Sequence, residues 1–106
     1  MNLFNMFARK DINEGVKRFR ENKDAVLLDV RTSEEYASGH IEGSQNIPLD
    51  ELDRVDSVIK NKNVPLYVHC LSGGRSARAA AYLRGKGYKE VYDIGGIGLY
   101  RGKIVV

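Results

Sequence analysis

The sequence predicts an α/β fold: a mostly parallel central sheet of about five strands, flanked by helices on both faces. One observation is that short apolar runs, typical of strands covered on both sides, alternate with amphipathic or alanine-rich segments typical of helices. Another is that 106 residues suffice for one domain, residues 1–106, with no internal repeat or low-complexity linker. In such folds, ligands bind at the carboxyl ends of the parallel strands.

The first predicted elements are a helix and a strand. Asp11 can cap a helix that runs to about residue 21, and its apolar residues fall on one face: Ile12, Val16 and Phe19. The apolar run 25–28 predicts a strand that is covered on both faces. Asp29 and Arg31 close this strand, and we expect the pair to have a structural role rather than a catalytic one.

Two helical segments are predicted before the next strand. Thr32 and Glu35 form a capping box that begins a short helix, Gly39 ends it, and two side chains can face the core: Tyr36 and Ala37. After a turn and a short strand over residues 41–47, an approximately helical apolar stripe runs through residues 49–59. Its members are Leu52, Val55, Val58 and Ile59.

The second half of the chain predicts strand, helix and strand again. A strand over residues 66–68 leads to His69 and Cys70, and a helix over 76–84 follows. This helix can lie close on the sheet through small residues: Ala77, Ala80 and Ala81. After a strand over 90–94, the glycine-rich segment 95–98 predicts a turn or a close backbone approach, and Tyr100 could cover the core.

Cys70, the only cysteine, lies at the junction between a predicted strand and a predicted helix. The residues that follow it are Leu71, Ser72, Gly73, Gly74, Arg75 and Ser76. The two glycines allow the loop to curl, so that free N–H groups of the helix start point at one centre that suits an anion. A lone cysteine is by default a small buried apolar residue, but no packing requirement explains this loop. We therefore predict that Cys70 is a nucleophile, stabilised as thiolate by the helix start and Arg75.

The sequence resembles the rhodanese-like sulfurtransferases in two separate places. In the loop, that family has Cys, four residues, Arg and then Ser or Thr, which matches Cys70, Arg75 and Ser76. Upstream, residues 27–48 resemble the N-terminal signature of the family, and Gly95-Gly96 resembles a later part. The upstream matches are Leu27-Leu28-Asp29-Val30-Arg31-Thr32, Glu35-Tyr36, Gly39-His40-Ile41, Gly43-Ser44 and Asn46-Ile47-Pro48. The resemblance covers roughly residues 24–100 and implies the rhodanese-like fold.

The resemblance implies a double displacement. Cys70 would take the outer sulfur of a thiosulfate-like or persulfide donor and pass it to a thiophilic acceptor, such as a thiol or a thioredoxin-like protein. The loop from Leu71 to Ser76 would bind the substrate, without a cofactor or a metal. Arg75 would stabilise negative charge or hold an anionic donor, and the Ser76 hydroxyl would cap the helix or donate to sulfur. His40 resembles a structural residue of the family.

His69 is next to Cys70 in sequence, but neighbouring strand residues point to opposite faces. We therefore expect His69 to pack or to form hydrogen bonds rather than to deprotonate the cysteine.

Two other functions remain open. Many members of the family that use thiosulfate have a basic or polar residue after the cysteine, whereas Leu71 is apolar. The protein could therefore be a sulfur carrier or binding module with little turnover on thiosulfate. Cysteine phosphatases also combine a thiolate and an arginine, but they have five residues between the two, and this chain has four. A phosphatase is the remote alternative.

Charge and composition limit the partners. The formal net charge is +3: residues 1–59 have eight Lys/Arg against twelve Asp/Glu, and residues 60–106 have nine against two. The positive half could steer anionic donors toward the loop, or its cations could simply be solvated. A dense basic run with aromatic residues, as in nucleic-acid binders, is missing, and so is a membrane-spanning segment. A single cysteine and the lack of metal-ligand spacing predict a reducing, cytoplasmic location without a structural metal.

Overall fold

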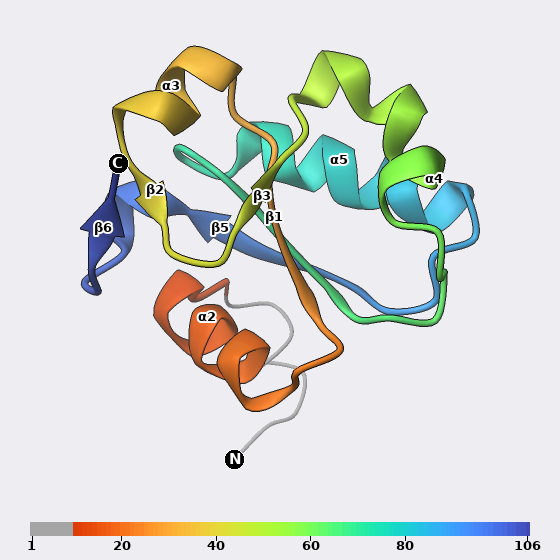
Figure 1. Cartoon of the computed structure of the whole chain (residues 1–106), viewed down its shortest axis with the longest axis horizontal. Helices are drawn as coiled ribbons and strands as arrows, with labels where there is room; N and C mark the ends of the chain where they lie inside the picture. The colour runs from red at the N-terminus through yellow and green to blue at the C-terminus, as the bar shows by residue number, and fades with distance from the viewer. Residues whose placement is uncertain (1–9) are drawn as a thin grey trace.

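A parallel sheet of four strands forms the centre of the computed structural model, which describes residues 10–106 (Figure 1). The strands lie in the order β3-β1-β4-β5, and all neighbours are parallel. Their bounds are β1 Val26–Asp29, β3 Gln45–Asn46, β4 Leu66–Cys70 and β5 Val91–Gly96. The α/β class and the mostly parallel sheet are confirmed. The central sheet has four strands rather than about five.

Two further strands form a small antiparallel ribbon of their own. Strand β2, His40–Ile41, pairs with β6, Ile104–Val105, in the register His40 opposite Val105 and Ile41 opposite Ile104. The sequence analysis assigned no element to residues 101–106. Strands of two residues leave almost no alternating pattern to detect.

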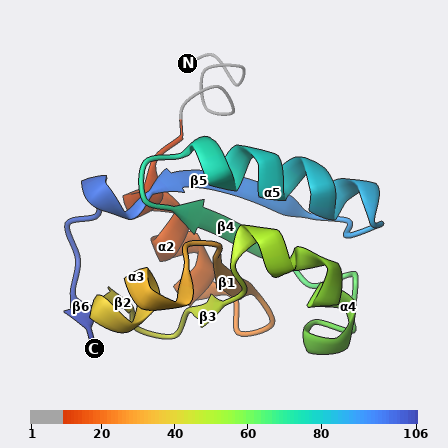
Figure 2. The ribbon, with the colours of Figure 1, turned by 90° about the horizontal axis from the view of Figure 1, so that it is seen from above.

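Helices cover both faces of the sheet (Figures 1 and 2). Helix α2, Ile12–Glu21, packs on one face, and α5, Gly74–Gly85, packs along β4 and β5 on the other. The 3₁₀ helix η1, Leu49–Arg54, continues into α4, Val55–Val58, on the α5 side. The short helix α3, Ser33–Ser38, precedes β2, and a single 3₁₀ turn η2, Ile97–Leu99, follows β5. In the described residues, no helix is long and apolar enough to cross a membrane.

The two faces of the sheet have separate apolar cores. Leu27 and Leu28 are both fully buried, but Leu27 belongs to the cluster under α2 and Leu28 to the cluster under α5. This confirms that β1 is covered on both sides. The α2 core also contains Ile12, Val16, Ile41, Tyr67 and Ile94, with Phe19 and Tyr100 packed against it. The larger core under α5 includes Val68, Cys70, Ala79, Ala80 and Leu83.

The predicted helix starts are largely confirmed. The Asp11 side chain accepts hydrogen bonds from the N–H groups of Asn13 and Glu14, so Asp11 is the N-cap of α2. Thr32 and Glu35 form the full capping box of α3. Gly15, a poor helix former, lies where α2 crosses the sheet, and a Cβ there would collide with the Ile94 side chain. A glycine in α2 thus permits close packing of the helix.

Three apolar residues are exposed although the sequence analysis placed them against the core. Val58 is 42% exposed, because residues 49–59 begin as a 3₁₀ helix with three residues per turn, so the predicted stripe with α-helical spacing does not stay on one face. Ala37 is exposed because α3 buries none of its residues. Ala81 is exposed because the inner face of α5 has helical spacing through Ser76, Ala79, Ala80 and Leu83.

Candidate active site

Cys70 ends β4, and its sulfur lies in a ring of hydrogen-bond donors at the start of α5. The cysteine is 1% exposed. Its Sγ accepts hydrogen bonds from the N–H groups of Gly73 at 3.0 Å and Ser76 at 3.3 Å. Helix α5 begins at Gly74, two residues earlier than predicted, so Gly74, Arg75 and Ser76 form its first turn. The structure therefore brings the cysteine and the N–H groups of the loop together.

These donors determine the ionisation of the thiol. Burial alone raises the pKa of Cys70. The contact with the Ser76 side chain and hydrogen bonds from the backbone N–H groups of Ser76, Gly73 and Ser72 outweigh burial, and the net pKa of Cys70 lies below the ordinary value. Thiolate is the nucleophilic form of cysteine, so the site makes a larger fraction of Cys70 reactive than in a free thiol.

Two glycines shape the loop, but they are not the pair that the sequence analysis singled out. Gly73 has φ +113°, a conformation that other residues rarely adopt, whereas Gly74 is helical with open space around it. At the other end of the loop, a Cβ on Gly96 would collide with the Leu71 carbonyl group. The Gly98 N–H also donates to the Leu71 carbonyl oxygen at 3.1 Å. The close backbone approach predicted for residues 95–98 is thus an approach to the cysteine loop.

Arg75 forms a two-fold hydrogen-bonded ion pair with Glu35 of α3. The distances are 2.7 Å from Nη1 to Oε1 and 3.0 Å from Nη2 to Oε2. The hydrogen bond from Arg75 holds the pKa of Glu35 at about 2 and raises the pKa of Arg75. Sequence reasoning assigned Glu35 only to the capping box and missed this contact. Its Oε1 also accepts from the Thr32 N–H, so one carboxylate joins the start of α3 to the loop.

Ser76 lies fully buried beneath the cysteine sulfur and contacts an aspartate that sequence reasoning also missed. Its Oγ lies 3.5 Å from Cys70 Sγ and donates to Asp93 Oδ1 at 2.8 Å. The same hydroxyl lies 3.0 Å from the carbonyl oxygen of Gly73. The outer residues of the loop, Leu71 and Ser72, are exposed, and Leu71 is 46% exposed.

Behind the loop, a buried ion pair holds the end of β1. Asp29 is fully buried and binds Arg31 through both carboxylate oxygens, with 2.7 Å from Nη2 to Oδ2. Arg31 Nη2 also donates to the carbonyl oxygen of Gly39 at 2.8 Å. The pair therefore connects β1 with the turn that leads into β2, which fits the expected structural role.

The two histidines make contacts away from the cysteine sulfur. His69 is fully buried, and its Nδ1 donates to the Cys70 carbonyl oxygen at 3.3 Å, while Nε2 lies 3.8 Å from Asp29 Oδ2. Burial lowers the pKa of His69, so the ring is neutral. The His40 ring stacks on Tyr36 at 3.8 Å between centroids. Within residues 10–106, no group of three or more His, Cys, Asp or Glu residues could hold a metal ion.

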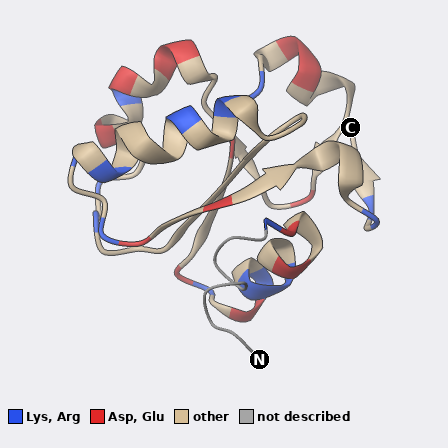
Figure 3. Ribbon diagram, turned by 180° about the vertical axis from the view of Figure 1, so that it is seen from behind, with Lys and Arg blue, Asp and Glu red and all other residues tan. Residues whose placement is uncertain are grey.

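Two cations near the loop are in ion pairs, and a third, Arg101, lines a pocket with Ser72 and Gly73 without an ion pair to any described residue. Arg75 is bound to Glu35, and Lys10 Nζ lies 2.7 Å from Asp93 Oδ2. Figure 3 shows basic positions of α5 beside acidic positions of η1. Acids of the first half thus oppose part of the positive charge of the second half, through the pair of Arg75 with Glu35 and the pairs of Lys62 and Lys86 with Asp56.

Comparisons with known proteins agree with this fold. The sequence model of the family described as Rhodanese-like domain matches residues 13–101. The chain belongs to the rhodanese-like domain family. It is 37% identical over 90 residues to the thiosulfate sulfurtransferase GlpE of Pseudomonas putida (strain GB-1), covering 83% of this chain and 80% of GlpE. It is 41% identical over 83 residues to the uncharacterized protein YqhL of Bacillus subtilis, covering 77% of this chain and 65% of YqhL.

The solved structures support the same assignment. A structure described as rhodanese with anions from E. coli matches with a TM-score of 0.71 at 33% identity. The match covers 76% of this chain and 96% of that rhodanese chain. The rhodanese-like fold predicted from the loop and the upstream signature is therefore confirmed.

The conformation of Gly73 gives a first prediction. Gly73→Ala forces a side chain into the positive-φ region and should lower the free energy of unfolding by about 1–3 kcal/mol, measured by urea denaturation. Gly74→Ala is the matched control, and we expect it to leave stability unchanged or raise it by about 0.4–1 kcal/mol. Equal destabilisation by the two substitutions would contradict the assignment of the strained position to Gly73.

The Arg75–Glu35 pair gives a second prediction. Because the pKa of Glu35 is lowered from 4.5 to about 2, its stabilising contribution is present above about pH 4.5 and is lost as the pH falls toward 2. Glu35→Gln should lower the free energy of unfolding at neutral pH by about 0.5–1 kcal/mol. The difference from wild type should shrink between pH 5 and pH 2 in urea titrations. Glu34→Gln, also in the first turn of α3, serves as control; a pH-independent deficit in Glu35→Gln would refute the pairing.

Proposed function

We propose that this protein is a sulfurtransferase that carries sulfane sulfur on Cys70 as a persulfide. The observation that carries the proposal is the buried Cys70 sulfur, which accepts two backbone N–H hydrogen bonds at the start of α5. The same arrangement can hold an anionic sulfur without a metal or a cofactor. The likeness to the GlpE thiosulfate sulfurtransferases supports the proposal.

The proposed reaction has two displacement steps. The Cys70 thiolate attacks the outer sulfur of a donor, the donor's S–S bond breaks, and sulfite or a thiolate leaves with the electron pair. The new persulfide then carries the negative charge on its outer sulfur. An acceptor nucleophile attacks that sulfur, and the bond between the two sulfurs breaks to regenerate the Cys70 thiolate. The two steps balance without an external oxidant or reductant.

The charges of the loop favour a persulfide donor over thiosulfate. Leu71 provides no charge next to the nucleophile, and the guanidinium of Arg75 is already bound by Glu35. A thiosulfate dianion therefore finds no unpaired cation within residues 71–76, and only Arg101, from the pocket that it lines with Ser72 and Gly73, could attract it. The donor side of an organic persulfide, in contrast, can contact the exposed Leu71 side chain. In this proposal a thiol or a thioredoxin-like protein accepts the sulfur.

One observation favours the alternative of a sulfur carrier that acts only with a partner protein. Two exposed apolar side chains, Leu71 at 46% and Leu99 at 77%, flank the contact in which the Gly98 N–H donates to the Leu71 carbonyl oxygen. Exposed apolar residues beside a reactive cysteine suit a protein donor or acceptor.

The contacts of the loop give no support to phosphatase chemistry. A phosphatase needs a protonated acid for the leaving alcohol. Glu35, with its pKa at about 2, is ionised at neutral pH, and Asp93 is paired with Lys10.

The proposal predicts that Cys70 gains sulfur. Intact-mass spectrometry after exposure to thiosulfate, or separately to a low-molecular-weight persulfide, should show the added mass of one sulfur atom. Cyanide or a thiol should remove it, and Cys70→Ala should not acquire it. If a folded protein gains no sulfur from either donor, the enzyme proposal fails in this form and a partner-dependent carrier becomes the better hypothesis.

The charge argument predicts that Leu71→Arg improves the use of thiosulfate. The added cation should raise kcat/KM for thiosulfate about threefold or more, with a gain that decreases at high salt. Leu99→Arg is the matched control, because Leu99 is also exposed but does not follow the nucleophile. An unchanged kcat/KM for Leu71→Arg, or an equal gain in Leu99→Arg, would count against a role of charge at residue 71.

A further inference from the structure

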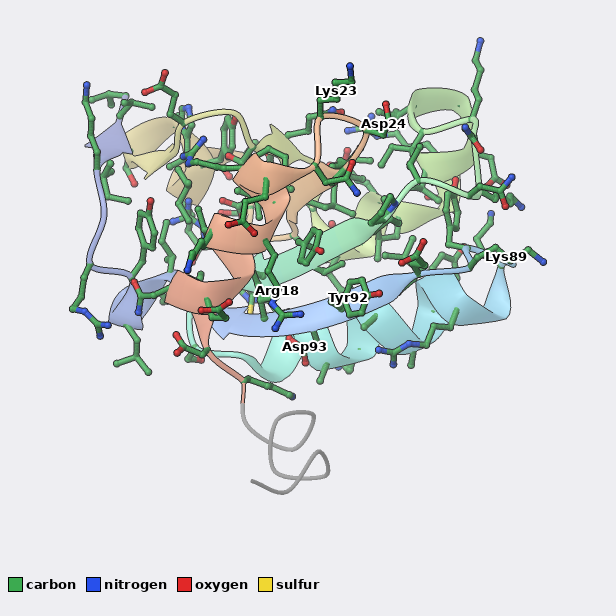
Figure 4. All side chains as sticks on the ribbon, turned by 90° about the horizontal axis from the view of Figure 1, so that it is seen from below. Arg18, Lys23, Asp24, Lys89, Tyr92 and Asp93 are labelled. Atoms are coloured by element: carbon green, nitrogen blue, oxygen red, sulfur yellow. The ribbon has the colours of Figure 1, made fainter. Side chains whose placement is uncertain are left out.

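A line of close contacts connects the Cys70 sulfur to the protein surface. The Ser76 hydroxyl lies 3.5 Å from Cys70 Sγ and 2.8 Å from Asp93 Oδ1, and Asp93 Oδ2 lies 2.7 Å from Lys10 Nζ. Figure 4 shows Asp93 on β5, on the side of the strand where α5 lies. The Asp93 side chain is 9% exposed and that of Lys10 is 46% exposed, so the line ends at solvent. Asp93 takes no part in the sulfur transfer proposed above.

The Ser76 hydroxyl has one proton and two candidate anionic acceptors. A hydroxyl can donate one hydrogen bond while its lone pairs accept others. When Cys70 is a thiol, the Ser76 proton can face Asp93, its shortest contact, while Ser76 Oγ accepts from the S–H group, so the sulfur and Asp93 do not compete. When Cys70 is a thiolate, the sulfur and the Asp93 carboxylate compete for the same proton, and one of the two anions loses it.

We propose that Asp93 is a positioning residue that holds the Ser76 hydroxyl proton away from sulfur and so disfavours negative charge on Cys70 Sγ. The inference rests on the proposed role of Cys70 as the nucleophile. Asp93 itself is held by the Gly95 N–H, which donates to Oδ1 at 3.1 Å, and by the positive charge of Lys10. Lys10 Nζ and Asp93 Oδ2 form an ion pair without the geometry of a hydrogen bond. Lys10 therefore offsets part of the negative charge of Asp93, and the Ser76 hydroxyl remains a hydrogen-bond donor to the carboxylate.

The arrangement favours the sulfur-loaded protein. In the persulfide, the inner sulfur is neutral and the charge lies on the outer sulfur. The inner sulfur then no longer competes with Asp93 for the Ser76 proton. The hydroxyl can then remain with Asp93 at no cost to the anion. Addition of sulfur thus removes the competition between two anions for one proton, which exists in the free thiolate. Asp93 therefore shifts the equilibrium between free thiolate and persulfide toward the persulfide.

The other charged groups around the cysteine act differently. Arg75 and Glu35 on the α3 side neutralise each other, and so do Asp29 and Arg31 behind β4. His69 is neutral and donates to the Cys70 carbonyl oxygen. Of the carboxylates in the described residues, only that of Asp93 is hydrogen-bonded to the hydroxyl next to the sulfur.

The test is a titration of the Cys70 thiolate by its ultraviolet absorbance in matched variants. Asp93→Asn removes the competing anion and should raise the ratio of thiolate to thiol at a fixed neutral pH about threefold or more. Lys10→Gln removes the cation that offsets part of the charge of Asp93. Asp93 then binds the Ser76 proton more strongly, and the ratio of thiolate to thiol should fall. Glu90→Gln removes another carboxylate of the same region and should leave the ratio unchanged. Loss of fold cannot produce these opposite signs.

A second comparison isolates the hydroxyl. In a Ser76→Ala background, Asp93→Asn should lose most of its effect on the thiolate ratio, because no proton is left to share. An unchanged ratio in Asp93→Asn, or an effect that persists undiminished without the hydroxyl, would overturn the proposal. The readout needs no sulfur donor, so this inference and the proposed sulfur transfer can fail independently. If the inference holds, the persulfide fraction of Asp93→Asn at equilibrium with a fixed persulfide donor is also lower than that of wild type.

Discussion

The hydrogen bonds from the Gly73 and Ser76 N–H groups to the Cys70 sulfur are the constraint on which the rest of the structure depends. They require that β4 ends at the cysteine and that α5 begins only a few residues later. The connection is so short that one residue, Gly73, must adopt a positive φ. The helix has to lie close to the sheet, and its small inner residues, Ala79 and Ala80, allow this. Sheet, helix and loop thus share one geometric requirement.

Two acids from distant parts of the chain complete this arrangement. Glu35 of α3 neutralises Arg75 on one side, and Asp93 of β5 binds the Ser76 hydroxyl on the other. The site therefore relies on backbone dipoles more than on free cations to attract negative charge. Dipoles fixed by a helix and a tight loop need no reorganisation when charge develops. This reliance on dipoles is the basis of our proposal that the donor is a persulfide rather than a dianion.

Local chemistry explains which features could be predicted from the sequence. The Thr32 capping box, the doubly covered strand at Leu27 and Leu28, and the junction at Cys70 all depend on neighbours in sequence. The partners of Arg75 and Ser76 could not be predicted, because Glu35 and Asp93 reach the loop only through the tertiary fold. Helix phase was also missed where it changed along the chain, as at the transition from η1 to α4 that leaves Val58 exposed.

The pairing of β2 with β6 has a consequence for the order of folding. The ribbon joins residues 40–41 to residues 104–105. Because the entropy of loop closure grows with the logarithm of loop length, closing this loop costs about 2 kcal/mol more than closing the loop of a few residues around Cys70. Contacts between distant segments form late in small domains. We therefore expect the ring of N–H groups around the sulfur to assemble first. The anchorage of α3, which comes directly before β2 and carries Glu35, would be completed only when the ribbon closes.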